Sequence, residues 1–325
     1  MIENFDSIIS NAKTVAISGH VRPDGDCVGS CLAMYNYIAD NFSEVCVRVF
    51  LDPIPNKFNF LTNSDKVEDI HLLSEDEVFD LYIALDCSEG KRLGDAFKYY
   101  QAAKKRICID HHFSNAGSFA DENYIIPDES STCELVYNQL PKDKITKEIA
   151  ECLYTGIIHD TGVFQYSCTT ENTMKAAGFL MSKGINYSQI CDESYYANTM
   201  VQNKMLGKAL LECKTFEDGK IIAVVFSKED MQKFGAKSSD LDGIVQALRD
   251  TVGVEVSVFL YQLDDGSYKG STRAKGDVDL TVVTGYFGGG GHKKASGFSV
   301  ETDSPWDVVE KVIQLIKEQF VQLGL

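Results

Sequence analysis

The feature that most constrains the fold is an alternation of short apolar strands with helical segments in the first half of the chain. Strands are predicted at 14–18, 45–51, 81–85 and 106–109, and helices at 27–39, 94–103, 132–139 and 146–159. Parallel neighbours need a crossover connection, usually a helix, so this alternation favours a mainly parallel sheet with helices on both faces. We therefore expect an N-terminal α/β domain with a doubly wound sheet.

The pattern changes toward the C-terminus. Residues 172–213 are mostly helical, and strands are then predicted at 221–226, 254–260 and 267–272, with helices at 241–249, 278–286 and 305–322. A length of 325 residues also favours two domains, at about 150 residues each. We expect one domain over 1–193, a connecting helix or linker over 194–213, and a smaller α/β domain over 214–325, with the active site in the cleft between the two domains.

Composition excludes several classes of protein. The net charge of −17 disfavours long duplex DNA as a partner, because affinity for DNA comes mainly from neutralising phosphates, but a short phosphorylated ligand needs only a local positive site. No apolar run is long enough to span a membrane, and the N-terminus does not resemble a secretory signal, so we expect a cytoplasmic protein without a membrane partner. The ten cysteines contain no Cys-x-x-Cys pair and are interpreted as packed thiols.

Acidic and histidine residues follow three of the predicted strands. They are His20, Asp24 and Asp26 after the first strand, Asp86 after the third, and Asp110-His111-His112 after the fourth. Because ligands of open α/β sheets bind at the carboxyl ends of the strands, we expect these side chains to meet at one edge. Any one of these acids alone would be interpreted as a turn or cap residue, but their joint occurrence favours a binding site.

A divalent metal site accounts for this set of side chains. Asp160, at the end of a predicted helix, adds a further carboxylate. Carboxylates with a few imidazoles and no thiolate suit manganese or magnesium, and two divalent ions would nearly neutralise the acids. Paired metals of this kind are a common device for hydrolysing phosphoesters. His159 is left open between a structural and a functional role, and His71 is interpreted as a surface residue.

A run of four glycines, Gly288 to Gly291, precedes His292 in the second domain. Glycines let the backbone approach a ligand closely and direct N–H groups at a phosphate or base. Between residues 268 and 297, five basic residues outnumber two acidic ones, which is a positive island on an acidic chain. A flexible linker is the alternative, but the run is followed by a strand-like segment at 297–300.

These motifs resemble those of the DHH phosphoesterase superfamily, which is named after the triplet seen here at 110–112. The resemblance implies that two Mn²⁺ ions (Mg²⁺ or another divalent ion being an alternative) are bound by His20, Asp24, Asp26, Asp86, His111 and Asp160. It also implies that Asp86 bridges the two ions and that Asp110 supports its loop. His112 would lie beside the substrate phosphate, where it stabilises charge or donates a proton to the leaving oxygen.

The glycine run resembles the DHH-associated C-terminal domain, and the pattern as a whole is similar to stand-alone oligoribonucleases that also hydrolyse 3′-phosphoadenosine 5′-phosphate (pAp). This resemblance implies that Arg273, Gly289, Gly290, Gly291 and His292 bind the substrate. The implied activity is hydrolysis of short RNA oligonucleotides and dinucleotides to 5′-mononucleotides, and of pAp to AMP and phosphate. A homodimer is left open.

Other functions on the same scaffold remain as alternatives. A phosphodiesterase acting on cyclic di-AMP or linear dinucleotides fits the same motifs. A family II-type inorganic pyrophosphatase shares the N-terminal motifs, but the glycine–histidine segment counts against it. A non-catalytic nucleotide sensor would be expected to lack some of the metal ligands, and none is missing from this sequence.

Overall fold

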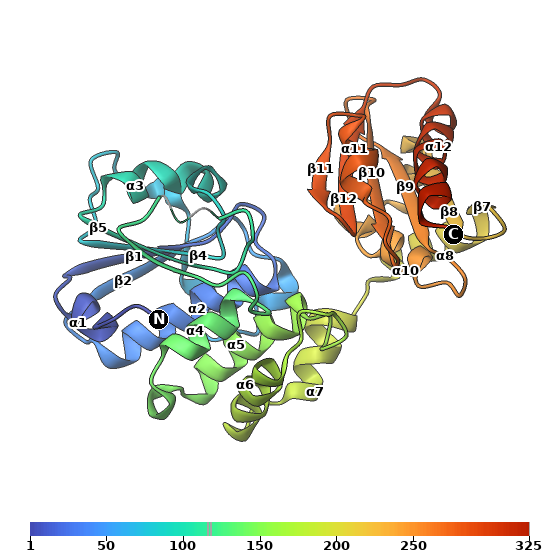
Figure 1. The fold of residues 1–325 in the computed structure, drawn as a ribbon. Helices are drawn as coiled ribbons and strands as arrows, with labels where there is room; N and C mark the ends of the chain where they lie inside the picture. The colour runs from blue at the N-terminus through green and yellow to red at the C-terminus, as the bar shows by residue number, and fades with distance from the viewer. Residues whose placement is uncertain (116, 118, 325) are drawn as a thin grey trace. The chain divides into compact units, whose positions relative to one another are not determined.

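The computed structural model of the protein describes residues 1–115, 117 and 119–324 (Figure 1). The chain forms two compact units, Met1–Ala197 and Asn198–Leu325. The boundary between them falls inside the segment expected to be a connector, and helix α8 (Met200–Glu212) belongs to the second unit. Each unit is built around its own sheet.

The sheet of the first unit is six-stranded and parallel throughout its pairings. Its strands are β1 (Thr14–Ser18), β2 (Cys46–Phe50), β3 (Val67–Glu68), β4 (Leu81–Leu85), β5 (Lys105–Asp110) and β6 (Glu122–Ile125). They lie in the order β3-β2-β1-β4-β5-β6, so the direction of winding reverses between β1 and β4. The prediction of a doubly wound parallel sheet is confirmed, and the two edge strands, β3 and β6, are additions to it.

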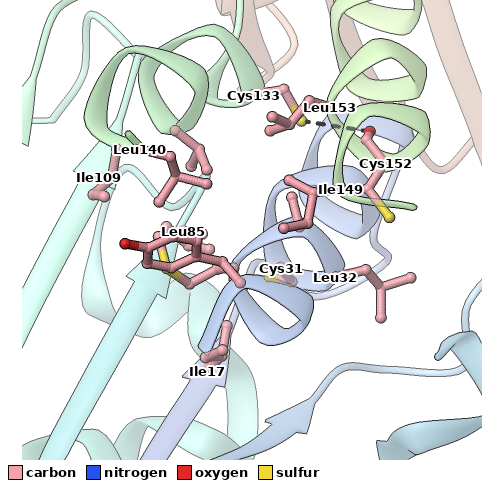
Figure 2. Packing of buried hydrophobic residues seen from close by; sticks show 14 of the residues in the cluster. Ile17, Cys31, Leu32, Leu85, Ile109, Cys133, Leu140, Ile149, Cys152 and Leu153 are labelled. Carbon is pink, nitrogen blue, oxygen red and sulfur yellow. Dashed lines mark hydrogen bonds between the residues drawn. The ribbon is translucent and has the colours of Figure 1, made fainter. Parts of the chain in front are cut away.

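Helices cover both faces of this sheet. They are α1 (Phe5–Ser10), α2 (Gly25–Asn41), α3 (Phe97–Ala102), α4 (Thr132–Gln139), α5 (Lys147–Asp160), α6 (Glu171–Ser182) and α7 (Tyr187–Ile190), followed by a π-helix at Cys191–Tyr196. Alternate residues of the strands point to opposite faces. Ile17 and Leu85 therefore pack against α2 and α5, as Figure 2 shows, whereas Tyr82 packs with Tyr100 of α3 on the other face.

The second unit is a smaller α/β domain with a mixed sheet. Its strands are β7 (Lys214–Phe216), β8 (Ile221–Phe226), β9 (Val256–Gln262), β10 (Tyr268–Ala274), β11 (Gly290–His292) and β12 (Ala295–Val300). Only the β8–β9 pairing is parallel in the order β11-β12-β10-β9-β8-β7. Helices α11 (Leu280–Gly285) and α12 (Pro305–Leu323) contribute to the core on one face, and α8, α9 (Lys228–Phe234) and α10 (Ile244–Arg249) to the core on the other.

Neither disulfides nor membrane-spanning helices are found among the described residues. All ten cysteines are free thiols; Cys46 is exposed, whereas Cys87, Cys108 and Cys152 are buried as expected for small apolar side chains. No helix of the described part of the chain is long and apolar enough to cross a bilayer.

Candidate active site

The six residues expected to bind metal come together at the carboxyl edge of the parallel sheet. His20 follows β1, Asp86 follows β4 and His111 follows β5, whereas Asp26 lies in the first turn of α2 and Asp160 is the last residue of α5. Asp24, the sixth, caps the N-terminus of α2 by accepting hydrogen bonds from the backbone N–H groups of residues 26 and 27. Parallel strands and two helix ends thus converge on one point.

His111 lies at the centre of one half of this cluster. Its Nε2 is 3.1 Å from Asp160 Oδ2, 3.8 Å from Asp26 Oδ2 and 3.7 Å from Asp86 Oδ1. Its Nδ1 faces the carbonyl oxygen of Glu129 at 3.4 Å, which leaves Nε2 directed at the three carboxylates. One imidazole therefore joins acids from three separate elements.

Asp86 lies between the two halves of the cluster. Its Oδ1 faces His111, and its Oδ2 is 3.4 Å from Nε2 of His20, which is itself 3.6 Å from Asp24 Oδ2. Asp86 is 2% exposed and has a φ of 54°, a left-handed conformation that is uncommon outside glycine and typical of functional sites. Asp86 is therefore the carboxylate that both halves of the cluster share.

Burial and charge perturb the titration of the whole cluster. Burial, followed by repulsion from Asp86 and Asp160, raises the pKa of Asp26 well above its usual range. Burial also raises the pKa of Asp160 to about 6, although His111 opposes this. For His111 the effect of burial is outweighed by hydrogen bonding to Asp160 and by the other carboxylates, so its pKa rises to about 11. The surrounding carboxylates therefore strongly favour a positive charge at the position of the His111 imidazole.

His20 and Asp24 form a second pair, in which the charged form of the imidazole is again favoured. Burial lowers the pKa of His20, but hydrogen bonds to Asp24 and Asp86 outweigh it and raise the pKa to about 12. Hydrogen bonding and attraction to His20 outweigh burial for Asp24, whose pKa falls to about 2. Without a metal ion, protons on two imidazoles supply the positive charge that these carboxylates attract.

His112 is held beside the cluster by Asp110. Its Nδ1 is 2.7 Å from Asp110 Oδ1, and Asp110 Oδ2 accepts a 2.7 Å hydrogen bond from the side-chain amide of Asn115. Asp110 is fully buried, and the His112 side chain is 30% exposed. Burial lowers the pKa of His112, but the hydrogen bond to Asp110 and the charge of Asp86 outweigh this and raise it. An acidic partner on Nδ1 fixes the ring and favours its protonated form.

The N-terminus of α4 is part of the site, and the sequence interpretation missed it. The backbone N–H groups of Thr132 and Cys133 donate to the two carboxylate oxygens of Asp26, at 2.6 and 2.8 Å. The Thr132 hydroxyl donates to Asp86 Oδ1 at 3.2 Å. A signal was present in the sequence, although the interpretation did not use it: a helix was predicted at 132–139, and the first N–H groups of a helix have no partner within the helix.

The two histidines outside the predicted ligand set have different environments. His159 Nε2 lies 3.2 Å from the Ser194 hydroxyl and its ring packs against Phe58 and Tyr195, while burial lowers its pKa to about 4. These contacts give His159 a structural role. His71 is exposed, as expected, but it has a partner, since its Nε2 lies 3.5 Å from Asp95 Oδ2.

In the second unit, the end of the glycine run and His292 form one strand of a hairpin, β11. Residues 290–292 pair with 295–297 of β12, so the run is no flexible linker. A Cβ atom at Gly289 would lie 2.3 Å from the carbonyl oxygen of Gly297, so a side chain there would collide with the neighbouring backbone. Arg273 of β10 and His292 of β11 are both paired with Ala295, which places them in one row across three strands. Four of the five predicted substrate-binding residues therefore lie in neighbouring strands of this sheet, and the fifth, Gly289, directly precedes β11.

The donors of the first unit fit divalent cations with a preference for oxygen and imidazole ligands. Donor atoms of Asp26, His111 and Asp160 lie within 4.8 Å of one another, as do those of Asp86, His111 and His112. Cys27 lies near His20 and Asp86, but burial raises the pKa of its thiol well above the usual range, so it stays protonated. Carboxylates and imidazoles without a thiolate suit manganese or magnesium.

Two family models match the chain in the order of its two units. The DHH family N-terminal domain matches residues 14–157, and the DHHA1 domain matches residues 218–322. Together with the fold and the acid–histidine cluster, these matches define the class: the chain contains a DHH domain followed by a DHHA1 domain, and it is a hydrolase that acts on phosphoester bonds.

Individual relatives are similar along nearly the whole chain. The sequence is 29% identical over 313 residues to the bifunctional oligoribonuclease and PAP phosphatase NrnA of Bacillus subtilis (strain 168), with 94% of each chain covered. It is 28% identical to NrnA of Thermus thermophilus, with 95% of this chain and 91% of that protein covered.

Solved structures support the same fold. An exopolyphosphatase-related protein from Bacteroides fragilis matches with a TM-score of 0.91 at 26% identity, over 99% of this chain and 97% of that one. RecJ from Thermus thermophilus, solved in complex with Mn²⁺, matches with a TM-score of 0.54 at 11% identity, over 96% of this chain and 53% of that one. The latter likeness is one of fold.

Proposed function

We propose that the protein is a manganese-dependent phosphoesterase that hydrolyses short oligoribonucleotides to 5′-mononucleotides and pAp to AMP and phosphate. The observation that carries this proposal is the cluster of His20, Asp26, Asp86, His111 and Asp160, with Asp86 between its two halves. The names of the NrnA relatives support the choice of substrates, and the Mn²⁺ complex of RecJ supports the choice of metal.

We assign the metal ligands as His20, Asp24, Asp26, Asp86, His111 and Asp160. Bound divalent ions supply Lewis-acid chemistry, since they activate water and neutralise the charge of a phosphate. The protein holds its own ligands in place: α4 donates two N–H groups to Asp26, and the Thr132 hydroxyl donates to Asp86. Such supporting hydrogen bonds fix the direction of each carboxylate.

His112 is the residue that we assign to proton transfer. The Asp110 carboxylate accepts a hydrogen bond from Nδ1 of His112, so the second ring nitrogen of His112, Nε2, is the one that can donate to the substrate. When the phosphorus–oxygen bond breaks, a proton from Nε2 neutralises the leaving oxygen, and water contributes the oxygen that replaces it on phosphorus. The raised pKa of His112 favours the protonated ring that this step needs.

The hairpin of the second unit is proposed to bind the nucleotide. Arg273 offers a guanidinium suited to a phosphate, and His292 lies in the same row of the sheet. The exposed backbone of Gly290 and Gly291 offers polar groups without side chains in the way. Replacing Arg273 or His292 by Ala should therefore raise KM for the oligonucleotide substrates.

A hydrolysis panel with added Mn²⁺ tests the proposal. The panel contains linear di- to pentaribonucleotides, pAp, cyclic di-AMP and pyrophosphate, and the products are separated by chromatography. We expect 5′-mononucleotides from the short RNAs and AMP from pAp. Hydrolysis of cyclic di-AMP in preference to the linear substrates would favour the cyclic dinucleotide alternative, and hydrolysis of pyrophosphate alone would refute the proposed substrate class.

A matched pair of variants tests the site itself. Asp86→Asn removes the charge between the two halves of the cluster and should abolish turnover. Asp76→Asn makes the same chemical change at an exposed residue outside the cluster and should leave the rate as in the wild type. Substantial residual activity in Asp86→Asn, with the fold intact by circular dichroism, would contradict the ligand assignment.

A further inference from the structure

A cavity of about 600 Å³ lies next to the acid cluster, on the side of β2 and β3. Its walls come from the segments that follow β1 and β2, from β3, and from two 3₁₀ segments, Ile70–Leu72 and Gly90–Ala96. The volume is in the range of small-molecule sites, and the carboxyl ends of parallel strands are where such sites occur. The predicted metal ligands do not explain this cavity, because only His20 among them lines it.

His20 forms a wall between the cavity and the acid cluster. Its Nε2 faces Asp86 and Asp24, whereas its Nδ1 faces the carbonyl oxygen of Val21. The next segment, at Val21, is held by a 2.8 Å hydrogen bond to the carbonyl oxygen of Arg92, which ties this wall to the 3₁₀ segment opposite. A molecule whose phosphate lay at the acid cluster could therefore extend a neighbouring group past His20 into the cavity.

The lining of the cavity combines apolar surface with acceptors of hydrogen bonds. Leu51, Val67 and Ile70, which are partly exposed, supply the accessible apolar surface, whereas Phe50 and Leu93 lie behind it and are almost fully buried. Four carboxylates line the cavity: Asp52, Glu68, Asp69 and Asp95. No Lys or Arg is found among the described lining residues. A phosphate would be repelled by this charge, whereas a neutral ligand that donates hydrogen bonds would be favoured.

Three of these acids already have partners, which leaves Asp95 as the clearest candidate for a ligand contact. Glu68 is bound by Arg48, with N–O distances of 2.9 and 2.5 Å. Asp69 accepts from the backbone N–H of His71, and Asp52 accepts from that of Arg22. Asp95, 73% exposed, is paired only loosely with exposed His71 at 3.5 Å. The Asp95 carboxylate can exchange this contact for one with a ligand.

We propose that this cavity is a subsite for a nucleobase of the substrate, and that it prefers bases with an exocyclic amino group. The proposal rests on the proposed function, because the ligand is the nucleotide next to the phosphate that is cleaved. A base offers a planar apolar face to the partly exposed side chains of Leu51, Val67 and Ile70. Adenine, guanine and cytosine also carry an amino group that can donate to a carboxylate, and uracil lacks one.

The first test compares substrates with the full-length wild-type protein and Mn²⁺. KM and kcat are measured for CpC, ApA and UpU, and for ApA analogues in which one of the two bases is absent. We expect KM for CpC and ApA to be lower than for UpU by about tenfold, the lower end of the effect of a hydrogen bond to a charged group, because the Asp95 carboxylate is largely exposed to solvent. Removing the base that enters the cavity should raise KM, so the two analogues that each lack one base should differ from one another in KM.

The second test changes the cavity. Asp95→Leu removes the acceptor at similar size and should erase the preference for CpC over UpU. Asp95→Trp adds bulk at the mouth and should make KM insensitive to removal of the base that mattered in the wild type. Asp76→Leu and Asp76→Trp, at an exposed acid outside the cavity, are the matched controls and should keep the wild-type pattern.

The outcomes separate the subsite from the proposed function. If the wild type hydrolyses dinucleotides but KM does not depend on the base or on Asp95, the subsite is refuted and the proposed function stands. If the Asp95 variants change only the affinity for Mn²⁺, measured by calorimetry, the cavity is a cation site and the inference is wrong. If no oligonucleotide is hydrolysed, both the proposed function and the subsite are wrong.

Discussion

The hydroxyl of Thr132 offers a sharp test of how this site is built. It donates a 3.2 Å hydrogen bond to Asp86 Oδ1, and both residues are buried. Thr132→Val keeps the shape of the side chain and the backbone N–H that donates to Asp26, but removes this one donor. A hydrogen bond to a charged group contributes about 1.5–3 kcal/mol, which corresponds to about a tenfold to hundredfold loss of metal affinity.

Calorimetric titration with Mn²⁺ measures this loss directly, without relying on turnover. We expect weaker Mn²⁺ binding in Thr132→Val and near wild-type binding in Thr132→Ser, which retains the hydroxyl. Thermal unfolding of both variants without metal checks that the substitution has not destabilised the fold around α4. Equal Mn²⁺ affinity in the wild type and Thr132→Val would refute the view that this hydroxyl positions Asp86, and an equal loss in Thr132→Ser would point to packing instead.

Two glycine pairs give further predictions. In α5, a Cβ at Gly156 would lie 2.2 Å from Cys133 Sγ and 2.8 Å from Asp26 Oδ1, so Gly156→Ala should destabilise the fold by about 1–3 kcal/mol in urea unfolding and weaken Mn²⁺ binding. Gly178→Ala in α6, where nothing lies within 4 Å, should instead stabilise by about 0.5–1 kcal/mol; destabilisation there would contradict this reasoning. In the hairpin, Gly289→Ala should lower the melting temperature more than Gly290→Ala, because only the former meets the backbone of β12, and equal effects would be evidence against close strand packing.

The sequence was enough to predict the frame of the fold because its strands are buried and well separated. The predicted strands at 14–18, 81–85 and 221–226 coincide with β1, β4 and β8. Strands β3 and β6 were not predicted from the sequence. Strand β3 has two residues and β6 is only partly buried, so neither has a clear apolar pattern. Edge strands of this kind owe their conformation to the neighbour with which they pair.

The acid cluster was predictable for a topological reason. In a parallel sheet every strand ends at the same edge, so ligands that follow different strands must be neighbours, whatever the exact angles. This reasoning placed His20, Asp86 and His111 together without any contact being known. It could not reveal Thr132 or the cavity, because those depend on how α4 and the two 3₁₀ segments pack in three dimensions.

The three-dimensional contacts also explain how the protein offsets the charge of its buried carboxylates. Asp26, Asp86, Asp110 and Asp160 lie close together and are mostly buried, an arrangement that would oppose folding if nothing offset it. The fold offsets it locally: α4 donates to Asp26, Asn115 donates to Asp110, and imidazoles lie between the remaining acids. The N–H donors and the amide are fixed parts of the fold, whereas the protons on the imidazoles can be replaced. We expect those protons to be exchanged for divalent cations when the proposed metal site is loaded, because this exchange would keep the charge of the site balanced.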